Sequence, residues 1–217
     1  MPATYTLFLG TPSISSWSLR PYVAMRAVGA PFEKTFITLR QPDTKAEILK
    51  HSPSGKIPAL RIQENGKTST VWDSLAICET LAERHPAIGL WPDDPITRAE
   101  ARSISAEMHA GFPDVRDQFG LAFGQSLPMP ELRDDTKKQA ARIIDLWSSA
   151  LSRFGKSGGY LYGRLSVADC MYAPVVSRFS TYGVDVPDDV KTYMDRIWAL
   201  PAMQEWLNFT KTETPIA

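Results

Sequence analysis

The chain has 217 residues, of which 43% are hydrophobic and 22% charged, with 24 basic and 24 acidic side chains. A formal charge of zero argues against a non-specific nucleic-acid surface and a polybasic membrane anchor, and the short apolar runs argue against a transmembrane span. The N-terminus also lacks the pattern of a signal peptide. The two cysteines, Cys78 and Cys170, have no CxxC partner, so we expect no disulfide, no metal site and a cytoplasmic location.

The first part of the chain alternates strand and helix signals. A strand is expected over residues 4–10, a helix over 16–29 that ends at Gly29, and a second strand over 31–39. A strand, a helix and a strand in this order predict a parallel pair joined by a right-handed crossover.

The next segments complete an α/β domain. Residues 45–51 predict a short helix, and 56–72 predict two strands joined at the hairpin turn Asn65-Gly66. A helix over 74–86 follows, stopped by Pro86. The order βαβ(α)ββα, with one parallel pair and one hairpin, predicts a mixed four-stranded sheet.

The remainder of the chain is predicted to be helical. We place the α/β domain at 1–87, a Pro/Asp-rich linker at 88–95 and an all-α domain at 96–217. The helical segments predicted from periodicity in the all-α domain are 96–123, 130–155, 166–183, 188–200 and 201–210. Gly111 and Pro113 should kink the first of these helices.

Three smaller expectations concern the interior. Ser166 and Asp169 should form a capping box at the start of one core helix. Cys78 and Cys170 should be buried, unreactive thiols. The tryptophans of the second half are assigned to the helical core: Trp147, Trp198 and Trp206.

Serines crowd the predicted start of the first helix, where capping needs only one. A helix start offers unpaired N–H groups and a positive dipole end, and a hydroxyl there can donate to the same anion. If the anion is a thiolate, its pKa falls; a fall of about two units takes about 2.7 kcal/mol, within reach of one or two charge-assisted hydrogen bonds. The alternative is simple N-capping by Ser15 or Ser16.

Two further clusters carry polar groups. Pro58 cannot donate to a sheet, so the Ile57–Pro58 peptide is expected to be cis or to lie at an edge; a cis bond would turn the Ile57 N–H and C=O outward, toward a peptide-like ligand. Ser74 is expected to cap the next helix, whose first amides form a second anion site, and Asp73 beside it suits an ammonium group. The alternatives are a strand-entry proline and plain capping.

These three clusters, in this order on this pattern of elements, resemble the cytosolic glutathione S-transferases over nearly the whole chain. The resemblance is strongest to serine-type bacterial enzymes and their zeta and theta relatives, which carry a motif like SSWSLRP, residues 15–21, at the first helix. It implies a thioredoxin-like first domain that holds glutathione as a co-substrate, an all-helical second domain and a homodimer.

The resemblance assigns the sulfur site to the first helix. Ser15 would donate its hydroxyl to the glutathione sulfur, with Ser16 as the rival assignment, while Ser16 or Ser18 would serve the helix. Trp17 stands where the zeta pattern has a cysteine, which argues against maleylacetoacetate isomerase activity. Because no cysteine lies near this helix, disulfide exchange of the beta or omega kind has no nucleophile.

The resemblance also implies contacts for the rest of glutathione. Ile57, before a cis Pro58, would pair through its backbone with the cysteinyl unit. Asp73 and Ser74 would hold the γ-glutamyl end, and Lys56 would reach the glycyl carboxylate.

The electrophile site should lie between the domains, against the first helix and the kinked helix. Its candidate residues are Trp17, Met108, His109 and Phe112. His109 is either a polar handle or general acid, or a hydrogen-bonded interface residue, and the apolar residues are either pocket or core.

The expected function is activation of glutathione as its thiolate and conjugation to a small hydrophobic electrophile. Glutathione-dependent isomerisation or peroxide reduction would use the same thiolate. The alternative from another class is a non-catalytic glutathione- or ligand-binding scaffold on the same fold. The expected partners are glutathione, the electrophile and a second copy of the chain, with no nucleic acid or membrane.

Overall fold

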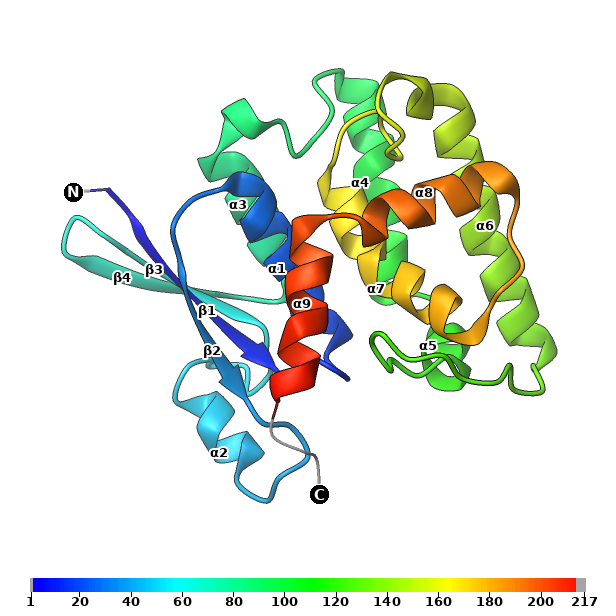
Figure 1. Cartoon of the computed structure of the whole chain (residues 1–217). Helices are drawn as coiled ribbons and strands as arrows, with labels where there is room; N and C mark the ends of the chain where they lie inside the picture. Colours follow the sequence, from blue (N-terminus) through cyan, green and yellow to red (C-terminus); the bar gives the residue numbers. More distant parts are fainter. Residues whose placement is uncertain (1, 214–217) are drawn as a thin grey trace.

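A four-stranded sheet forms one side of the molecule (Figure 1). The computed structural model describes residues 2–213. Its strands are β1 (Thr4–Gly10), β2 (Glu33–Ile37), β3 (Ala59–Glu64) and β4 (Lys67–Trp72), in the order β2-β1-β3-β4. β1 runs parallel to β2 with Leu7 opposite Lys34, and antiparallel to β3 with Leu7 opposite Leu60. The predicted mixed sheet is confirmed.

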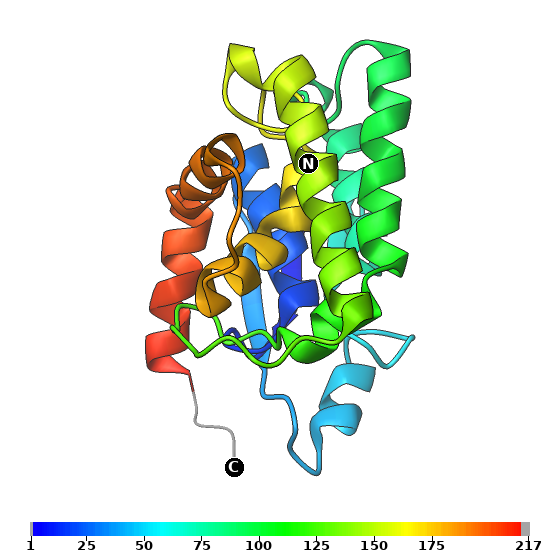
Figure 2. The same ribbon diagram turned by 90° about the vertical axis from the view of Figure 1, so that its right-hand side faces the viewer.

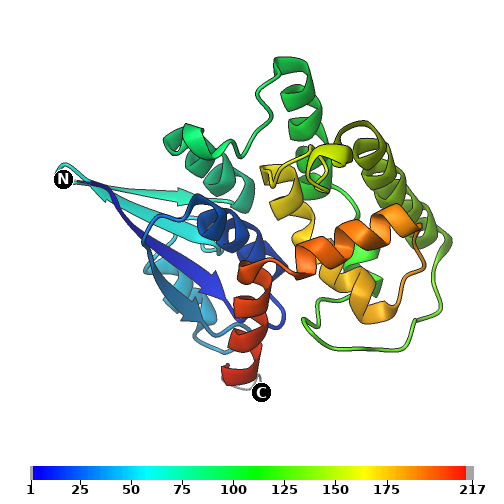
Figure 3. The same cartoon turned by 45° about the horizontal axis from the view of Figure 1, so that its top comes forward.

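Local sequence explains the turns that frame this sheet. Asn65 and Gly66 both have positive φ, 51° and 73°, which a tight hairpin between twisted strands requires. Helix α1 (Ser16–Val28) ends at Gly29 in the left-handed region, as predicted. The short helix α2 (Thr44–Leu49) packs beside β2, whereas α1 and α3 (Ser74–Arg84) lie between the sheet and the rest of the molecule (Figures 1 and 3).

The second part of the chain is helical. Short 3₁₀ turns lie at Pro86–Ile88 and Gly155–Ser157. The helices of this part are α4 (Pro95–Ala110), α5 (Pro113–Gln118), α6 (Asp134–Phe154), α7 (Val167–Tyr182), α8 (Asp188–Trp198) and α9 (Pro201–Thr212). The residue bounds placed on the two domains from sequence remain a prediction.

The expected single kinked helix over 96–123 is wrong, because two separate helices occupy this segment. α4 ends at Ala110, and Phe112 takes a left-handed conformation with φ 59°. Pro113 lacks the N–H that a continuing helix needs and restricts the residue before it, so the chain turns and α5 begins afresh.

Helix α7 runs through the middle of the helical part, with α4 beside it and Trp147 of α6 packed against its Tyr172 and Phe179 (Figure 2). The predicted capping box at its start, between Ser166 and Asp169, is confirmed. Cys170 on α7 and Cys78 on α3 are both fully buried, and burial raises the pKa of the Cys78 thiol to about 12. Their assignment as unreactive core thiols is consistent with this burial.

Helix α9 returns to the sheet-bearing part, where it lies against α1 (Figures 1 and 3). Trp206 on α9 is fully buried and donates from its indole N–H to the Pro12 carbonyl at 2.9 Å. Its ring lies 5.1 Å from that of Tyr22 on α1. The assignment of Trp206 to the helical core is therefore corrected: this side chain joins the two parts, whereas Trp147 is buried among the helices.

Candidate functional site

The start of α1 carries hydroxyl groups without a side-chain cap. Ser15 is the N-cap residue, but its side chain makes no capping hydrogen bond; its hydroxyl donates to Ser18 Oγ at 2.7 Å. Ser18 Oγ in turn accepts from the Gly10 N–H at 2.9 Å, which ties the end of β1 to α1. The alternative of simple capping by Ser15 or Ser16 is wrong, because no side-chain cap is formed, and Ser18 serves the helix only by joining its N-cap residue to β1. The positive end of this helix is left open to an anion.

Ser16, the first residue of α1, differs from Ser15 in its hydrogen bonding. Both side chains are largely buried, at 7% and 5% exposed. Among the described residues the Ser16 hydroxyl has no hydrogen-bond partner, whereas that of Ser15 is engaged with Ser18. The Ser16 hydroxyl can therefore donate to a ligand directly, whereas the Ser15 hydroxyl must first turn its proton away from Ser18.

The loop before β3 lies next to this helix start. The Ile57–Pro58 peptide is cis, as predicted. Ser15 and Ile57 flank Gly10: a methyl group at Gly10 would lie 3.0 Å from Ser15 Oγ and 3.1 Å from Ile57 Cδ1. No backbone hydrogen bond from Ile57 is found within residues 2–213, so its N–H and C=O are available to a peptide-like ligand. Lys56 beside it is exposed.

The start of α3 corrects one expectation. Asp73, not Ser74, is the N-cap residue: Asp73 Oδ1 accepts from the N–H groups of Leu75 at 2.9 Å and Ala76 at 3.4 Å. Ser74 is the first residue of α3, and its side chain is buried with an unpartnered hydroxyl. Asp73 holds φ at 79°, a strained value for a residue other than glycine, and such strain is concentrated at functional sites.

His109 connects this site to the helical part. Its Nε2 lies 3.1 Å from Asp73 Oδ2, and its ring packs edge-on against Trp17 at a centroid distance of 5.2 Å. The pKa of His109 is lowered, chiefly by burial and further by Arg20 and Arg116, while Asp73 opposes the shift. The neutral ring therefore carries its proton on Nε2 and donates to the carboxylate. These contacts are those expected of a hydrogen-bonded interface residue, and the role of polar handle or general acid stays a prediction.

The four candidates for the electrophile pocket divide into two pairs. Trp17 is 36% exposed, and the His109 side chain is partly exposed. Met108 and Phe112 are only 1% and 6% exposed and belong to the hydrophobic core. The structure thus brings Trp17 and His109 together at the surface between the parts, with the other two packed behind them.

Two arginines at this place were missed by sequence reasoning. The guanidinium carbons of Arg20 on α1 and Arg116 on α5 lie 4.3 Å and 4.6 Å from the centre of the Trp17 ring. Arg20 stands in an apolar helical face, and a charge at such a position was the available signal. Arg116 was indistinguishable from the other charged residues of its segment.

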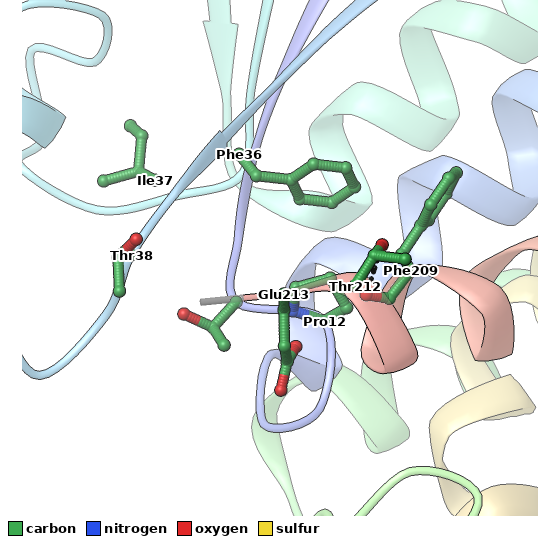
Figure 4. Close-up of a pocket in the computed structure, with 8 residues that line it drawn as sticks. Pro12, Phe36, Ile37, Thr38, Phe209, Thr212 and Glu213 are labelled. Carbon is green, nitrogen blue, oxygen red and sulfur yellow. Dashed lines mark hydrogen bonds between the residues drawn. The ribbon is translucent and has the colours of Figure 1, made fainter. Parts of the chain in front are cut away.

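A separate pocket of about 220 Å³ lies between the end of β2 and the end of α9 (Figure 4). Phe36 and Phe209 face it from the two elements, and Glu213 lies at its edge. Glu213 accepts from the backbone N–H of Ser13 at 3.0 Å, which links the end of α9 to the loop before α1. None of the residues predicted for the site lines this pocket.

No cluster of three or more His, Cys, Asp or Glu side chains within residues 2–213 is arranged to hold a metal ion. No helix in the same range combines the length and apolar character needed to cross a membrane.

Comparison with known proteins places this geometry in a family. Residues 14–84 match the glutathione S-transferase N-terminal domain, and residues 130–208 match the corresponding C-terminal domain. The chain is 30% identical to maleylacetoacetate isomerase of Rattus norvegicus over 85% of its own length and 81% of that protein. The chain therefore belongs to the glutathione S-transferase family.

Two other comparisons differ in what they cover. A probable maleylacetoacetate isomerase of Caenorhabditis elegans is 35% identical, but the match spans 48% of this chain and under half, 46%, of that protein. The structure of a glutathione transferase homolog from Burkholderia, with bound glutathione, superposes with a TM-score of 0.71 over 97% of this chain and 100% of that one. At 24% identity this likeness shows the fold: a thioredoxin-like domain followed by a helical domain.

Proposed function

We propose that this protein binds glutathione, stabilises its thiolate at the start of α1 and conjugates it to a small electrophile. The observation that carries the proposal is the open start of α1. Its hydroxyls and unpaired amides lie beside the cis Pro58 loop, where a peptide-like ligand can pair with the chain. A bound thiolate at this position gains both the helix dipole and a hydroxyl donor.

The chemical step needs only the thiolate and a close approach. The thiol proton passes to solvent when glutathione binds. The sulfur lone pair then forms a C–S bond with the electrophilic carbon. A leaving group departs with the electrons of its bond to that carbon, or, in an addition, the neighbouring atom takes a proton from water. Holding both reactants in one site supplies the remaining acceleration.

The other glutathione contacts follow the predicted clusters. The Ile57 backbone would pair with the cysteinyl unit, and Lys56 would meet the glycyl carboxylate. The Ser74 N–H, which Asp73 does not cap, and the unpartnered Ser74 hydroxyl suit the γ-glutamyl carboxylate. The γ-glutamyl ammonium would share Asp73 Oδ2 with His109, because Asp73 Oδ1 already caps α3.

Two observations bear on which serine meets the sulfur. Ser15 lies beside Ile57, the residue proposed to hold the cysteinyl unit, which favours Ser15. Its hydroxyl would have to turn from Ser18, whereas the Ser16 hydroxyl is already free of partners among residues 2–213. We propose Ser15 as the donor and keep Ser16 as its rival.

A glutathione-dependent isomerase is the second candidate, because the relatives named above carry that activity in their names. It would use the same thiolate and add it reversibly to the substrate. Trp17 stands in place of the zeta-type cysteine, and this favours transfer over isomerisation of maleylacetoacetate. Peroxide reduction and a non-catalytic binding role are the remaining alternatives.

The test is a pH titration of bound glutathione, followed by thiolate ultraviolet absorbance. Wild type is compared with Ser15→Ala, Ser16→Ala and the control Ser13→Ala. We expect a bound-thiol pKa about two units below the free value near 8.5, restored by Ser15→Ala and unchanged in the control. Restoration by Ser16→Ala alone moves the assignment to Ser16. An unshifted pKa with tight binding supports the scaffold alternative, and absence of binding refutes the proposal.

We further propose a homodimer located in the cytoplasm. Large apolar side chains are exposed on β4, on the 3₁₀ turn and at the start of α4: Trp72, Ile88 and Ile96. Both cysteines are free and buried, as suits a reducing compartment. Sedimentation velocity should give a mass near twice the chain's 24.1 kDa, and a monomer at micromolar concentration would contradict the dimer.

A further inference from the structure

Arg20 is a buried cation without a counterion. The residue is only 1% exposed, and its Nε and Nη1 have no hydrogen-bond partner among the described residues. None of the ion pairs found within residues 2–213 involves it. A guanidinium has five N–H donors, and buried polar groups are almost always hydrogen-bonded, so an acceptor is missing here.

The charges around Arg20 are mostly of the same sign. Arg116 and Arg178 lower its pKa, and together with the larger effect of burial they bring it to about 9. Cys78 and Asp73 act in the opposite direction and raise this pKa, but Asp73 is bonded to His109 and to the α3 amides. Arg20 thus has two further guanidinium groups near it and one carboxylate that is already hydrogen-bonded, which leaves a local excess of positive charge.

Arg178 and Arg116 already have partners, unlike Arg20. Arg178 donates to the carbonyls of Arg116 and Phe119, and Arg116 donates to those of Gly111, Met108 and His109. These bonds hold the ends of α4 and α5. Of the three arginines, Arg20 is therefore the one whose buried Nε and Nη1 donors lack an acceptor among residues 2–213.

The location of Arg20 places such a ligand beside the sulfur site. Arg20 lies one helical turn beyond Ser16, about 6 Å along the axis, and long side chains on a helix point back toward its N-terminus. Its guanidinium accordingly lies 4.3 Å from the ring of Trp17, in the first turn. Trp17 and His109 also form the exposed part of the proposed electrophile site.

We infer that Arg20, with the Arg116 charge and the Trp17 ring beside it, forms an anion subsite, and that the electrophile carries a carboxylate that binds there. The inference rests on the proposed function and narrows it from small hydrophobic electrophiles to those bearing a carboxylate. A planar guanidinium matches a carboxylate with two parallel hydrogen bonds. Such binding would fix the distance between the carboxylate and the reacting carbon next to the thiolate.

The experiment uses a matched pair of probes, 4-chloro-3-nitrobenzoate and its methyl ester. In both, the glutathione sulfur forms a bond to the ring carbon and chloride leaves with the bonding electrons. Each enzymatic kcat/KM is divided by the uncatalysed rate constant for the same probe, which removes their difference in intrinsic reactivity. We expect this ratio to favour the carboxylate by about 10- to 100-fold, the size of charge-assisted hydrogen bonds.

Variants test whether Arg20 causes the preference for the carboxylate probe. Arg20→Met should abolish the preference, Arg20→Lys should retain part of it, and the control Arg142→Met, on the exposed face of α6, should leave it unchanged. A preference for the ester in wild type, or one for the acid that survives Arg20→Met, overturns the inference. If Arg20→Met does not fold, wild type and Arg20→Lys decide the matter.

A binding measurement distinguishes failure of the inference from failure of the proposed function. Calorimetry with 4-methyl-3-nitrobenzoate, which has no leaving group, is performed on protein saturated with S-methylglutathione. Weakening by about 10-fold or more in Arg20→Met supports the subsite even if neither chloro probe is conjugated. Equal affinity in wild type and Arg20→Met overturns it even if the ester is conjugated. If Arg20→Met weakens glutathione itself by the same factor, the anion belongs to glutathione and the inference is wrong.

Discussion

Helices α1 and α7 both follow an N-cap serine, yet only α7 is closed. At α7, Asp169 Oδ2 accepts from the N–H and the hydroxyl of Ser166, and Asp169 Oδ1 accepts from the Leu161 N–H. At α1, Ser18 occupies the equivalent third helical position. A carboxylate at that position satisfies the donors of the helix start, whereas a neutral hydroxyl leaves its positive end for a ligand.

The comparison teaches how one residue type serves folding in one place and chemistry in another. The start of α7 lies in the core, where unpaired donors would be costly, and an acid completes them. The start of α1 lies where the cis Pro58 loop, Asp73 and Trp17 converge, and its donors stay unsatisfied by side-chain caps.

The largest expected effect is a loss of stability when the capping box at the start of α7 is removed. Asp169→Ala leaves three buried donors without an acceptor, so we expect the free energy of unfolding to fall by about 3 kcal/mol, measured by urea denaturation. Ser16→Ala should change it by less than about 0.5 kcal/mol, because its hydroxyl has no partner among the described residues. If Asp169→Ala and Ser16→Ala lower the free energy of unfolding equally, the two helix starts do not differ as described.

A second variant makes α1 resemble α7. Ser18→Asp places a carboxylate at the third helical position, able to accept from both Gly10 N–H and the Ser15 hydroxyl. We expect the pKa of bound glutathione to rise by about one to two units, since a fixed negative charge then opposes the thiolate. The titration above measures it, with Ser18→Asn as the neutral control. A pKa unaltered by Ser18→Asp would show that the helix start does not set it.

The smallest effect concerns the third helix start, at Asp73. The pKa of His109 is lowered in the fold, so its neutral form stabilises the protein above pH about 6.5, and this contribution is lost as pH falls through the lowered value. His109→Gln should therefore flatten the fall in unfolding free energy between pH 7 and 5. His51 and His85 remain in both proteins, so the difference isolates His109. Parallel pH profiles would contradict the assignment.

Much of the fold was predictable because its signals are local. The hairpin at Asn65-Gly66, the helix end at Gly29 and the Ser166–Asp169 capping box each depend on residues within one turn. The helix break at Phe112 was misjudged as a kink because a Gly–x–Pro pattern fits both outcomes, and packing around the left-handed residue decides between them.

The features of the candidate site also divide into those set by local sequence and those set by long-range packing. The sequence by itself determined that hydroxyls gather at the start of α1, that a proline precedes β3 and that an acid stands before α3. Only the tertiary structure decided that His109 bonds Asp73, that Trp206 joins α9 to α1 and that Arg20 is buried without a partner. The physical reason is range: caps and turns are set by neighbours a few residues away, whereas the surroundings of a buried charge depend on how helices far apart in the chain pack.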